Sequence, residues 1–494
     1  MNYSEFLKLI PEAFLVLALI LVFIGDFCLN KSERKNSVLS KLTAAMLVVV
    51  GLMTSTCSPA SAFGGLYVSS AAVNVMKMIL AFGSLIVVIM AQPWVEKTER
   101  LAGEFYMLLI STLLGMFFMM SSGNFLLFFL GLETASVPLA CMVAFDKWKK
   151  NSAEGAAKYI LVATFSSGVM LYGISFIYAA AGTLYFDDVA AALGVIMDGK
   201  IVDMAHGGIP VMQSPALAIM GLVFFFSGLG FKISLVPFHF WTADTYQGAP
   251  TPVTGYLSVV SKGAATLTLA IILMKVLQPL VIYWEMLLYI VICLTITIGN
   301  LFAIRQKELK RFMAFSSISQ AGYIMLAVVG NSETGIAALM YYVLIYVAAN
   351  MAVFTVINVV EHRGKGNTLM SCYDGFYQTN PKLAFLMTLA LFSLAGIPPF
   401  AGMFSKFFVF MAAAQEGSFA AYFVVFIALI NTVVSLYYYL LIVKAMYIKP
   451  AEQPLPTFQS DPASKLALAL CTLGVALFGI CSCLYGWLNS MAVI

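Results

Sequence analysis

Charged side chains interrupt several long apolar stretches of this sequence. They are the carboxylate Glu133 and the lysines Lys158, Lys232, Lys262 and Lys406. A charge at mid-membrane costs at least about 2.5–3.5 kcal/mol to insert, so such a residue usually faces a protein or water interior and carries function. Because amines and carboxylates bind and release protons, these residues favour proton transfer within a membrane.

Glu133 and Lys232 have the chemistry of a proton switch. Glu133 lies in NFLLFFLGLETASVPL with no opposite charge within reach on its own helix, and Lys232 lies in FSGLGFKISLVPFHFW. Burial alone favours a neutral lysine and a nearby anion favours a charged one, so moving the anion would change the proton affinity of the lysine. The alternative for Glu133 is a protonated structural carboxyl bonded to a neighbouring helix.

Prolines predict that two helices break beside a lysine. Pro237 follows Lys232, and Pro398 and Pro399 precede Lys406 in GIPPFAGMFSK. Proline removes a backbone donor and clashes with the preceding turn. The carbonyls left free at the end of the first half-helix would favour a cation such as Lys232. Helix packing is the alternative reason for these prolines.

Three further titratable residues have less specific settings. Lys262, in TPVTGYLSVVSKGAATLTLA, is central in its stretch and has small neighbours that allow close helix packing. His239 follows Pro237 and titrates near neutral pH, so it could pass protons between lysines or serve as a structural hydrogen bonder. Lys158, in SAEGAAKYILVATFSSG, could equally extend to water as a boundary residue.

Membrane-spanning helices must position these residues. Of the 494 residues, 62% are hydrophobic and 10% are charged, against roughly 45–50% and 25% in soluble domains. One span needs about 20 apolar residues. The sequence predicts an all-α polytopic membrane protein with fourteen spans, at 8–28, 40–57, 70–92, 104–121, 123–145, 155–181, 213–241, 251–275, 279–303, 310–330, 334–360, 381–414, 419–447 and 464–488.

The loop charges predict the orientation. One side holds nineteen lysines and arginines, and the other holds only Lys8, Lys200 and Lys275. Basic residues in short loops remain cytoplasmic, so we expect both termini on the periplasmic side of a bacterial inner membrane. The start, MNYSEFLKLIPEAFL, is interpreted as part of a retained first span, and segment 182–212 as an outer surface loop or short hairpin.

The two proline breaks lie five spans apart, and an odd number of spans turns a second copy over. This spacing predicts two inverted five-helix repeats, an arrangement typical of transport sites at mid-membrane. Glu12, Asp26 and Lys77 fall outside the repeats and are interpreted as contacts to neighbouring subunits. The predicted divisions are 1–102 (three helices), 103–276 (first repeat), 277–448 (second repeat) and 449–494 (last helix).

Several classes of site are not expected. Eight cysteines lie mostly in apolar runs without a CxxC pair or a nearby histidine cluster, which argues against metal and iron–sulfur centres. The basic residues form no patch that could track nucleic acid. No glycine-rich dinucleotide fingerprint follows a strand. We therefore expect that this chain binds no cofactor and no nucleic acid. Its expected non-protein partners are the lipid bilayer, water and protons.

Five blocks follow one another along the chain: GLETASVPL, SAEGAAKY, FKISLVPFHFWTADTYQGAPTPVTGYLSVVSK, KRFMAFSSISQAGY and GIPPFAGMFSKFFVF. In content and order they resemble the antiporter-like (Mrp-related) membrane subunits of NADH:quinone oxidoreductase, respiratory complex I. Among these subunits they resemble the subunit N type, which is equivalent to mitochondrial subunit 2. The longest block is the most specific. Lys406 favours the N type, because the M type usually has glutamate there, and the absence of a lateral helix argues against the L type.

This resemblance implies a proton-translocating subunit of an NADH-oxidising translocase. NADH, FMN, iron–sulfur clusters and quinone are then expected in other membrane and peripheral subunits, which would be its partners. It implies that Glu133 and Lys232 form a coupled pair and that Lys262 is the central relay. Lys406 would be the lysine of the exit channel, and His239 and Lys158 would lie in the connecting path.

One residue departs from the family pattern. Gln320, in SSISQAGY, stands where many members have histidine, and glutamine does not titrate. Waters and residues such as Tyr323 are expected to carry the relay between Lys262 and Lys406 instead. Two other functions stay open: a subunit of a multi-subunit cation/proton antiporter, and a scaffold whose buried charges only hold helices together.

Overall fold

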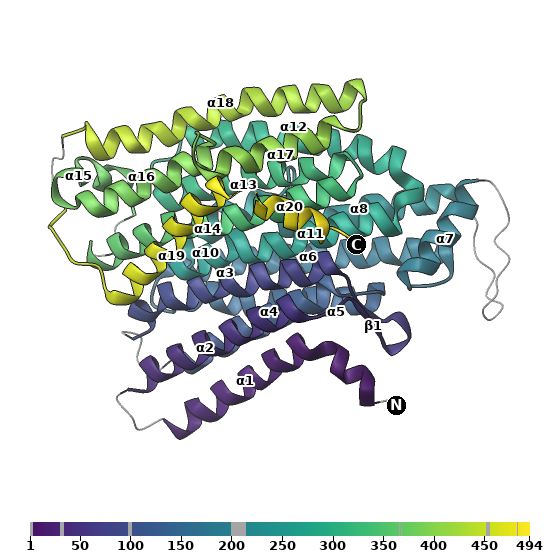
Figure 1. Cartoon of the computed structure of the whole chain (residues 1–494), viewed down its shortest axis with the longest axis horizontal. Coiled ribbons are helices and arrows are strands. Elements are labelled where there is room, and N and C mark those ends of the chain that lie inside the picture. Colours follow the sequence, from purple (N-terminus) through teal and green to yellow (C-terminus); the bar gives the residue numbers. More distant parts are fainter. Residues whose placement is uncertain are drawn as a thin grey trace.

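The computed structural model shows an all-helical bundle whose long helices lie side by side (Figure 1). It describes residues 3–29, 34–96, 101–198, 214–364, 366, 368–450, 455–481 and 483–494. Within these ranges, thirteen helices are long and apolar enough to cross a membrane, and two shorter apolar helices follow each other as one broken span. The prediction of an all-α polytopic protein with about fourteen spans is confirmed.

The long helices follow the predicted spans in order. They are α1 (Ile10–Cys28), α2 (Lys35–Thr56), α3 (Ala71–Val95), α4 (Ala102–Met120), α5 (Phe125–Val143), α6 (Lys150–Ala181), α8 (Pro215–Ile233), the continuous run of α10 (Thr251–Tyr256), a π-turn (Leu257–Ser261), α11 (Lys262–Ile271) and a second π-turn (Ile272–Val276), then α12 (Val281–Ile304), α13 (Leu309–Val329), α14 (Glu333–Arg363), α18 (Phe419–Tyr447) and α19 (Pro462–Ile480).

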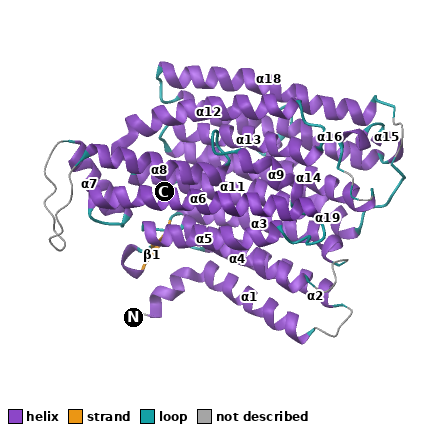
Figure 2. Ribbon diagram, turned by 180° about the vertical axis from the view of Figure 1, so that it is seen from behind, coloured by secondary structure: helices purple, strands orange, loops and turns teal. Residues whose placement is uncertain are grey.

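Shorter elements connect or complete the spans (Figure 2). A small antiparallel hairpin precedes α3 and pairs Ala60 with Ser69. The short elements are β1 (Ala60–Ala62), β2 (Tyr67–Ser69), α7 (Phe186–Met197), α9 (Phe240–Gly248), α15 (Phe376–Thr379), α16 (Pro381–Ala395), α17 (Ala401–Ala414) and α20 (Cys483–Ser490).

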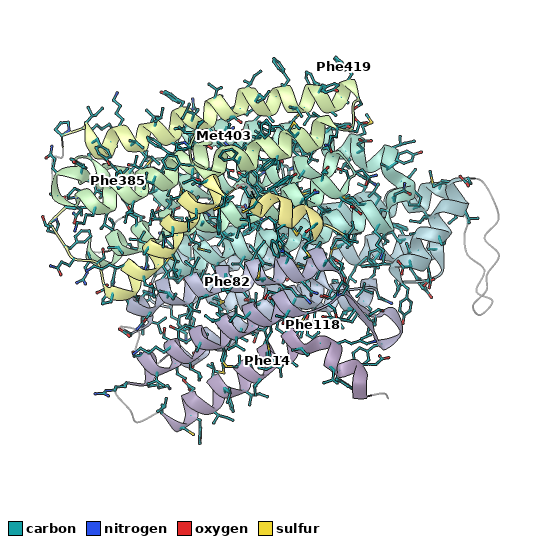
Figure 3. The ribbon with its side chains drawn as sticks, viewed as in Figure 1. Phe14, Phe82, Phe118, Phe385, Met403 and Phe419 are labelled. Carbon is teal, nitrogen blue, oxygen red and sulfur yellow. The ribbon has the colours of Figure 1, made fainter. Side chains whose placement is uncertain are left out.

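The core of the bundle lies around α13 and α14. The most apolar stretch of α13 is 100% buried and that of α14 is 94% buried, whereas α1 and α18, at opposite edges in Figure 1, are only 28% buried. Phe419 extends outward from the edge helix α18 in Figure 3. The edge helices expose apolar side chains, which would be unfavourable in water but is favourable in contact with lipid.

Glycines allow close contact within corresponding helix pairs of the two predicted repeats. A side chain added at Gly115 of α4 would come within 2.4 Å of the Ala135 nitrogen in α5. One added at Gly299 of α12 would come within 2.8 Å of the Ser319 nitrogen in α13. Small residues are what close helix packing in membranes requires. The repeat boundaries themselves stay a prediction.

Both predicted helix breaks are confirmed. Helix α8 ends at Ile233 and α9 begins at Phe240, with Pro237 between them. Helix α16 ends at Ala395 and α17 begins at Ala401. A left-handed residue follows each first half, Ser234 with φ 67° and Gly396 with φ 88°.

Other local predictions were wrong. Residues 242–248, interpreted as a loop between spans, form most of α9, so the broken helix continues past its predicted end. Segment 182–212 contains α7, which buries Val189 and Leu193 and has two aspartates in its first turn, where the helix dipole favours them. The last predicted span ends at Ile480 and is followed by α20. Some basic residues used for the orientation lie outside the described residues, namely Lys31, Lys97, Arg100, Lys200 and Lys365.

Candidate functional site

Lys232 is buried between α8, α5 and α6. Its Nζ donates to Ser136 Oγ at 2.8 Å and to the Tyr159 hydroxyl at 3.2 Å, and the residue is 3% exposed. Lys232 lies in the last turn of α8, where the negative end of the helix dipole favours a cation, but no described hydrogen bond joins its Nζ to a carbonyl of the break. The Phe231 carbonyl instead accepts a hydrogen bond from the Trp241 indole nitrogen at 3.1 Å, which ties α9 back to α8.

Glu133 lies on the same helix as the Ser136 that holds Lys232, three residues earlier. It is half-buried, and its Oε1 is enclosed without a hydrogen-bond partner. Among the described ion pairs within 4.0 Å, none joins Glu133 to Lys232. The structure therefore places Glu133 on the helix that contacts Lys232 through Ser136, but the two charged groups are not in direct contact.

Lys262 lies at the centre of the bundle. It follows the π-turn Leu257–Ser261, a feature frequent at functional sites, and it is 1% exposed. Its Nζ donates to Ser317 Oγ at 2.8 Å and to the Ser317 carbonyl at 3.1 Å, and lies 5.8 Å from the centre of the Tyr246 ring. The lysine thus joins the broken-helix region of the first predicted repeat to α13 of the second.

His239 lies in the first break, at the start of α9. Its ring stacks on Phe240 at 4.6 Å, and its Nδ1 is buried without a hydrogen-bond partner among the described residues. No hydrogen bond within that part of the chain joins it to Lys232 or Lys262. Its role in the connecting path stays a prediction, and a connection through it would need a bridging molecule or a side-chain movement.

Lys406 is held by the second break. Its Nζ donates to the Ala395 carbonyl, at the end of α16, at 3.0 Å and lies 5.0 Å from the centre of the Tyr323 ring. The end of a helix presents carbonyls with partial negative charge, which favour a cation. A cavity of about 10 Å³, lined by Lys406, Gln320 and Tyr342 among others, has room for about a single water.

A row of polar side chains on α13 lies between Lys262 and Lys406. Next to Ser317, which holds Lys262, Ser316 Oγ lies 2.5 Å from the Tyr439 hydroxyl. That hydroxyl accepts from Gln320 Nε2 at 3.2 Å. Gln320 in turn lines the small cavity beside Lys406. The polar row therefore begins at Lys262 and ends beside Lys406, and among the described residues no hydrogen bond joins its two parts at Ser317 and Ser316.

Gln320 is surrounded by tyrosines that the sequence alone did not single out. The Tyr342 hydroxyl donates to Gln320 Oε1, and Tyr439 accepts from its amide. Tyr323 donates to the Ala428 carbonyl at 3.3 Å, and its ring lies beside Lys406 Nζ. The expectation that Tyr323 assists the relay stays a prediction. Tyr439 lies far from Gln320 in sequence, within the apolar run of α18, so only packing reveals that its hydroxyl faces inward.

Lys158 belongs to a partly exposed ion-pair network. Its Nζ lies 2.8 Å from Glu154 and 2.6 Å from Asp244, and its side chain is 43% exposed. Asp244 also binds Arg311 at 2.5 Å. This setting matches the boundary-residue alternative, and the network links α6, α9 and α13 at the side of the bundle that carries the basic loops.

A second charged group lies nearby, between α14 and the loop before α6. Glu361 lies 3.6 Å from Lys149 and 3.9 Å from Lys310, and it accepts from the Thr251 hydroxyl. Burial lowers the pKa of Lys149, but the Glu361 and Asp146 carboxylates more than reverse this, so the pKa lies above its usual value. Both ion pairs of Glu361 join residues at least fifty positions apart, so they leave no local signal in the sequence.

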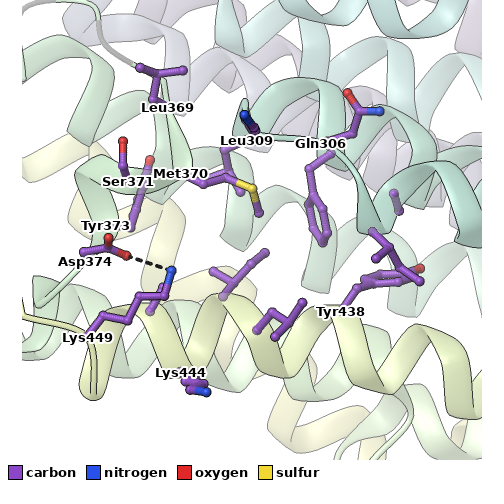
Figure 4. A pocket seen from close by; sticks show the side chains of 17 residues that line it. Gln306, Leu309, Leu369, Met370, Ser371, Tyr373, Asp374, Tyr438, Lys444 and Lys449 are labelled. Atoms are coloured by element: carbon purple, nitrogen blue, oxygen red, sulfur yellow. Dashed lines mark ion pairs between the residues drawn. The ribbon is translucent and has the colours of Figure 1, made fainter.

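A cavity of about 440 Å³ lies between the start of α13, the end of α18 and residues 369–374 (Figure 4). Lys449 extends across it towards Asp374, at 3.8 Å. Tyr438 lines the cavity, and its ring lies 4.6 Å from that of Tyr439. The cavity therefore approaches the polar row from one side of the bundle.

Glu12 and Lys77 were interpreted as contacts to neighbouring subunits, and this was wrong, because both are buried inside the chain. For Asp26, whose side chain is 27% exposed, the same interpretation stays a prediction. Lys77 Nζ lies 2.6 Å from Glu12 and 3.1 Å from the Tyr67 hydroxyl, all inside the chain. Asp26 pairs with Lys35 at 2.9 Å. A buried charge needs a partner, and here the three N-terminal helices supply it themselves.

The chain is similar to known proteins both in sequence and in fold. The family described as NADH:quinone oxidoreductase/Mrp antiporter, transmembrane, matches residues 122–435. The chain is 52% identical to NADH-quinone oxidoreductase subunit N of Phocaeicola vulgatus, with 100% of both chains covered.

Two solved structures share the fold. A chain of respiratory complex I from Thermus thermophilus with bound aureothin has a TM-score of 0.78 and 28% identity, covering 98% of this chain and 99% of that one. A chain of the Mrp complex from Dietzia sp. has a TM-score of 0.78 and 21% identity, covering 100% and 97%.

Proposed function

The chain belongs to the subunit N family of NADH-quinone oxidoreductases, and we propose that it moves protons across the membrane through its row of buried lysines and hydroxyls. The observation that carries the proposal is the polar row from Lys262 to the cavity beside Lys406. Amines, hydroxyls and water can each give up one proton while accepting another. Buried polar groups are costly and are not needed to pack an apolar core, so their presence here supports a functional role.

We propose that Glu133 controls the proton on Lys232. When the carboxylate approaches, it stabilises the charged lysine, and when it withdraws, burial favours the neutral form. Glu133 is placed for such a movement, because its Oε1 has no hydrogen bond within the described part of the chain to hold it. Only the Ser136 and Tyr159 hydroxyls then remain on the amine.

The released proton would pass to Lys262 and then along α13. Lys262 gives its proton to Ser317, and the Ser316–Tyr439 pair and the Gln320 amide carry the connection to the cavity at Lys406. Gln320 cannot titrate, so it orients Tyr439 and the cavity water while those groups carry the proton. The cavity between α13 and α18 would give water access to this second half.

The complex would supply the driving force from outside this chain. The relative from Phocaeicola vulgatus is named as a subunit of NADH-quinone oxidoreductase, and we propose the same assembly here, in a bacterial inner membrane with both termini on the periplasmic side. NADH oxidation and quinone reduction would occur in partner subunits. This chain would hold no redox centre, and His239 and Lys158 would lie beside the proton route.

The test is proton pumping per NADH oxidised in membrane vesicles that carry Lys262→Ala, with a native gel to measure assembly. We expect normal assembly and at least about a tenfold loss of pumping, because a positioned proton-transfer group contributes 10²-fold or more. Normal pumping with normal assembly would overturn the proposal. Lost assembly would instead favour a scaffold role for the buried charges.

A cation/proton antiporter subunit is the second candidate. The fold similarity to the Mrp complex chain supports it, but that chain is 21% identical, against 52% for the subunit N relative. Purification of the chain with its natural partners separates the two. A co-purifying NADH-oxidising arm supports the oxidoreductase, and sodium/proton exchange without such an arm supports the antiporter.

A further inference from the structure

A groove of about 910 Å³ runs along the bundle surface between α16 and α19. Its walls are apolar for most of its length. Leu383 and Leu468 form the buried floor, whereas Leu473 is 55% exposed. The two helices belong to the broken span that carries Lys406 and to the last span. Such a groove, inside the apolar belt of a membrane protein, is shaped for a hydrocarbon chain.

One end of the groove is polar and basic. Lys382, in the first turn of α16, and Lys465, in the first turn of α19, both line it and are exposed. Asn380 and Ser460 lie at the same end. The first turn of a helix presents free N–H groups that favour an anion. The groove therefore combines an apolar length with a cationic end.

Within the part of the chain that the structure describes, the two lysines have no neighbouring carboxylate of the kind that neutralises other cations on this side of the bundle. Among the described residues, neither takes part in an ion pair within 4.0 Å, and none of those lining the groove is Asp or Glu. The cavity of Figure 4 differs, because there Lys449 faces Asp374.

A second groove of about 910 Å³ lies on the other face of α19, against α2 and α3. There Arg363 is paired with Asp461 at 2.8 Å, and Glu96 also lines the wall. The two grooves are alike in size and share a helix, but only the one between α16 and α19 has an uncompensated positive end. The difference identifies the charge its occupant must have.

We propose that the α16–α19 groove binds one anionic phospholipid. Its phosphate lies between Lys382 and Lys465, and an acyl chain lies along Leu468 and Leu473. Lysines at the membrane surface attract anionic head groups, and their long stems let the amine stay at the polar boundary. The inference rests on this groove alone and does not depend on the proposed proton route.

The site is placed to stabilise the second helix break. Helix α16 carries the Ala395 carbonyl that binds Lys406. The far end of α19 touches the break directly, since a side chain added at Gly479 would come within 2.8 Å of the Pro399 carbonyl oxygen and the Ala401 nitrogen. A lipid wedged between α16 and α19 therefore fixes the two helices that hold the break in position.

The test uses the purified, assembled complex and photoreactive lipids. Phosphatidylglycerol and phosphatidylcholine, each with a reactive group in the acyl chain, are crosslinked in parallel and the labelled peptides are mapped. We expect phosphatidylglycerol to label residues 468–476 and 383–386 well above phosphatidylcholine. K382Q and K465Q should each reduce this labelling about fivefold, whereas the K382R/K465R variant should retain it.

The matched control is K41Q in the groove between α2 and α19, which should leave the labelling of 468–476 unchanged. Equal labelling by both lipids, or labelling insensitive to K382Q/K465Q, would mean ordinary boundary lipid and overturn the proposal. So would crosslinks only to another protein chain, or full competition by inorganic phosphate. If K382Q/K465Q fails to assemble, the ratio of the two lipids on the unaltered complex decides.

Discussion

The two broken helices hold their lysines in opposite ways. Lys232 lies on the first half-helix and points to the side-chain hydroxyls of Ser136 and Tyr159. Lys406 lies on the second half-helix and donates to the backbone carbonyl of Ala395. In the first break, no described hydrogen bond joins Lys232 to a carbonyl at the end of α8, and the Phe231 carbonyl, two residues before that end, accepts from Trp241.

Because of these different partners, Lys232 is easier to switch than Lys406. Side-chain partners can rotate away, and a carboxylate, Glu133, is on the same helix as one of them. A backbone carbonyl at a helix end cannot rotate without unwinding the helix, and Lys406 has no carboxylate within 4.0 Å among the described residues. We therefore interpret Lys232 as the controlled site and Lys406 as the fixed receiving site.

The largest expected effect is loss of either lysine. Lys232→Ala and Lys406→Ala should each lower proton pumping per assembled complex at least about tenfold, because each removes a proton-transfer group. NADH-driven quenching of a pH-sensitive dye in vesicles measures pumping, and a native gel gives the amount of complex. Pumping above half the unaltered rate in one variant would restrict the route to the other break.

A smaller effect is expected from the carboxylate, and only at the first break. Glu133→Gln should slow pumping several-fold in the unaltered chain. In a Lys232→Arg background it should add little, since the two residues act on one step, whereas in a Lys406→Arg background the effects should multiply. The same pumping assay measures the three single variants and the two double variants. Equal effects of Glu133→Gln in both backgrounds would contradict control of Lys232 by Glu133.

The caps of the two breaks provide a matched pair of stability variants. Gly396→Ala places a side chain at φ 88° and within 3.1 Å of Lys406 Cδ. We expect a loss of about 1–2 kcal/mol, because a left-handed backbone disfavours L-residues. Ser234 already adopts φ 67°, so Ser234→Gly should be neutral or stabilising. Thermal unfolding of the purified complex measures both, and an unchanged Gly396→Ala midpoint would contradict the role of the cap.

The smallest effect is expected at Lys158, outside both breaks. Its ion pairs with Glu154 and Asp244 are partly exposed, and such pairs contribute only about 0.2–1 kcal/mol. Lys158→Gln should change pumping less than twofold. Lys158→Arg, which retains the charge, is the control. A tenfold loss in Lys158→Gln with normal assembly would place Lys158 on the proton route after all.

Much of the architecture follows from the sequence because lipid imposes it locally. Spans must be apolar and helical, since a backbone in lipid has no other hydrogen-bond partners. This local requirement explains why the order of the helices and the breaks at Pro237 and Pro398–Pro399 were predicted. Its limit is shown by α7 and α9, whose helices depend on packing against neighbours as much as on apolar length.

By itself, the sequence determined which groups are expensive to bury: Glu133, Lys232, Lys262 and Lys406 stand out because their neighbours in the chain are apolar. Only the tertiary structure decided which groups face them. Tyr439 meets Gln320 across 119 positions, and Lys77 meets Glu12 across 65. The cost of burial is set by the local segment, whereas compensation comes from whichever helix packs alongside, and no local pattern records that partner.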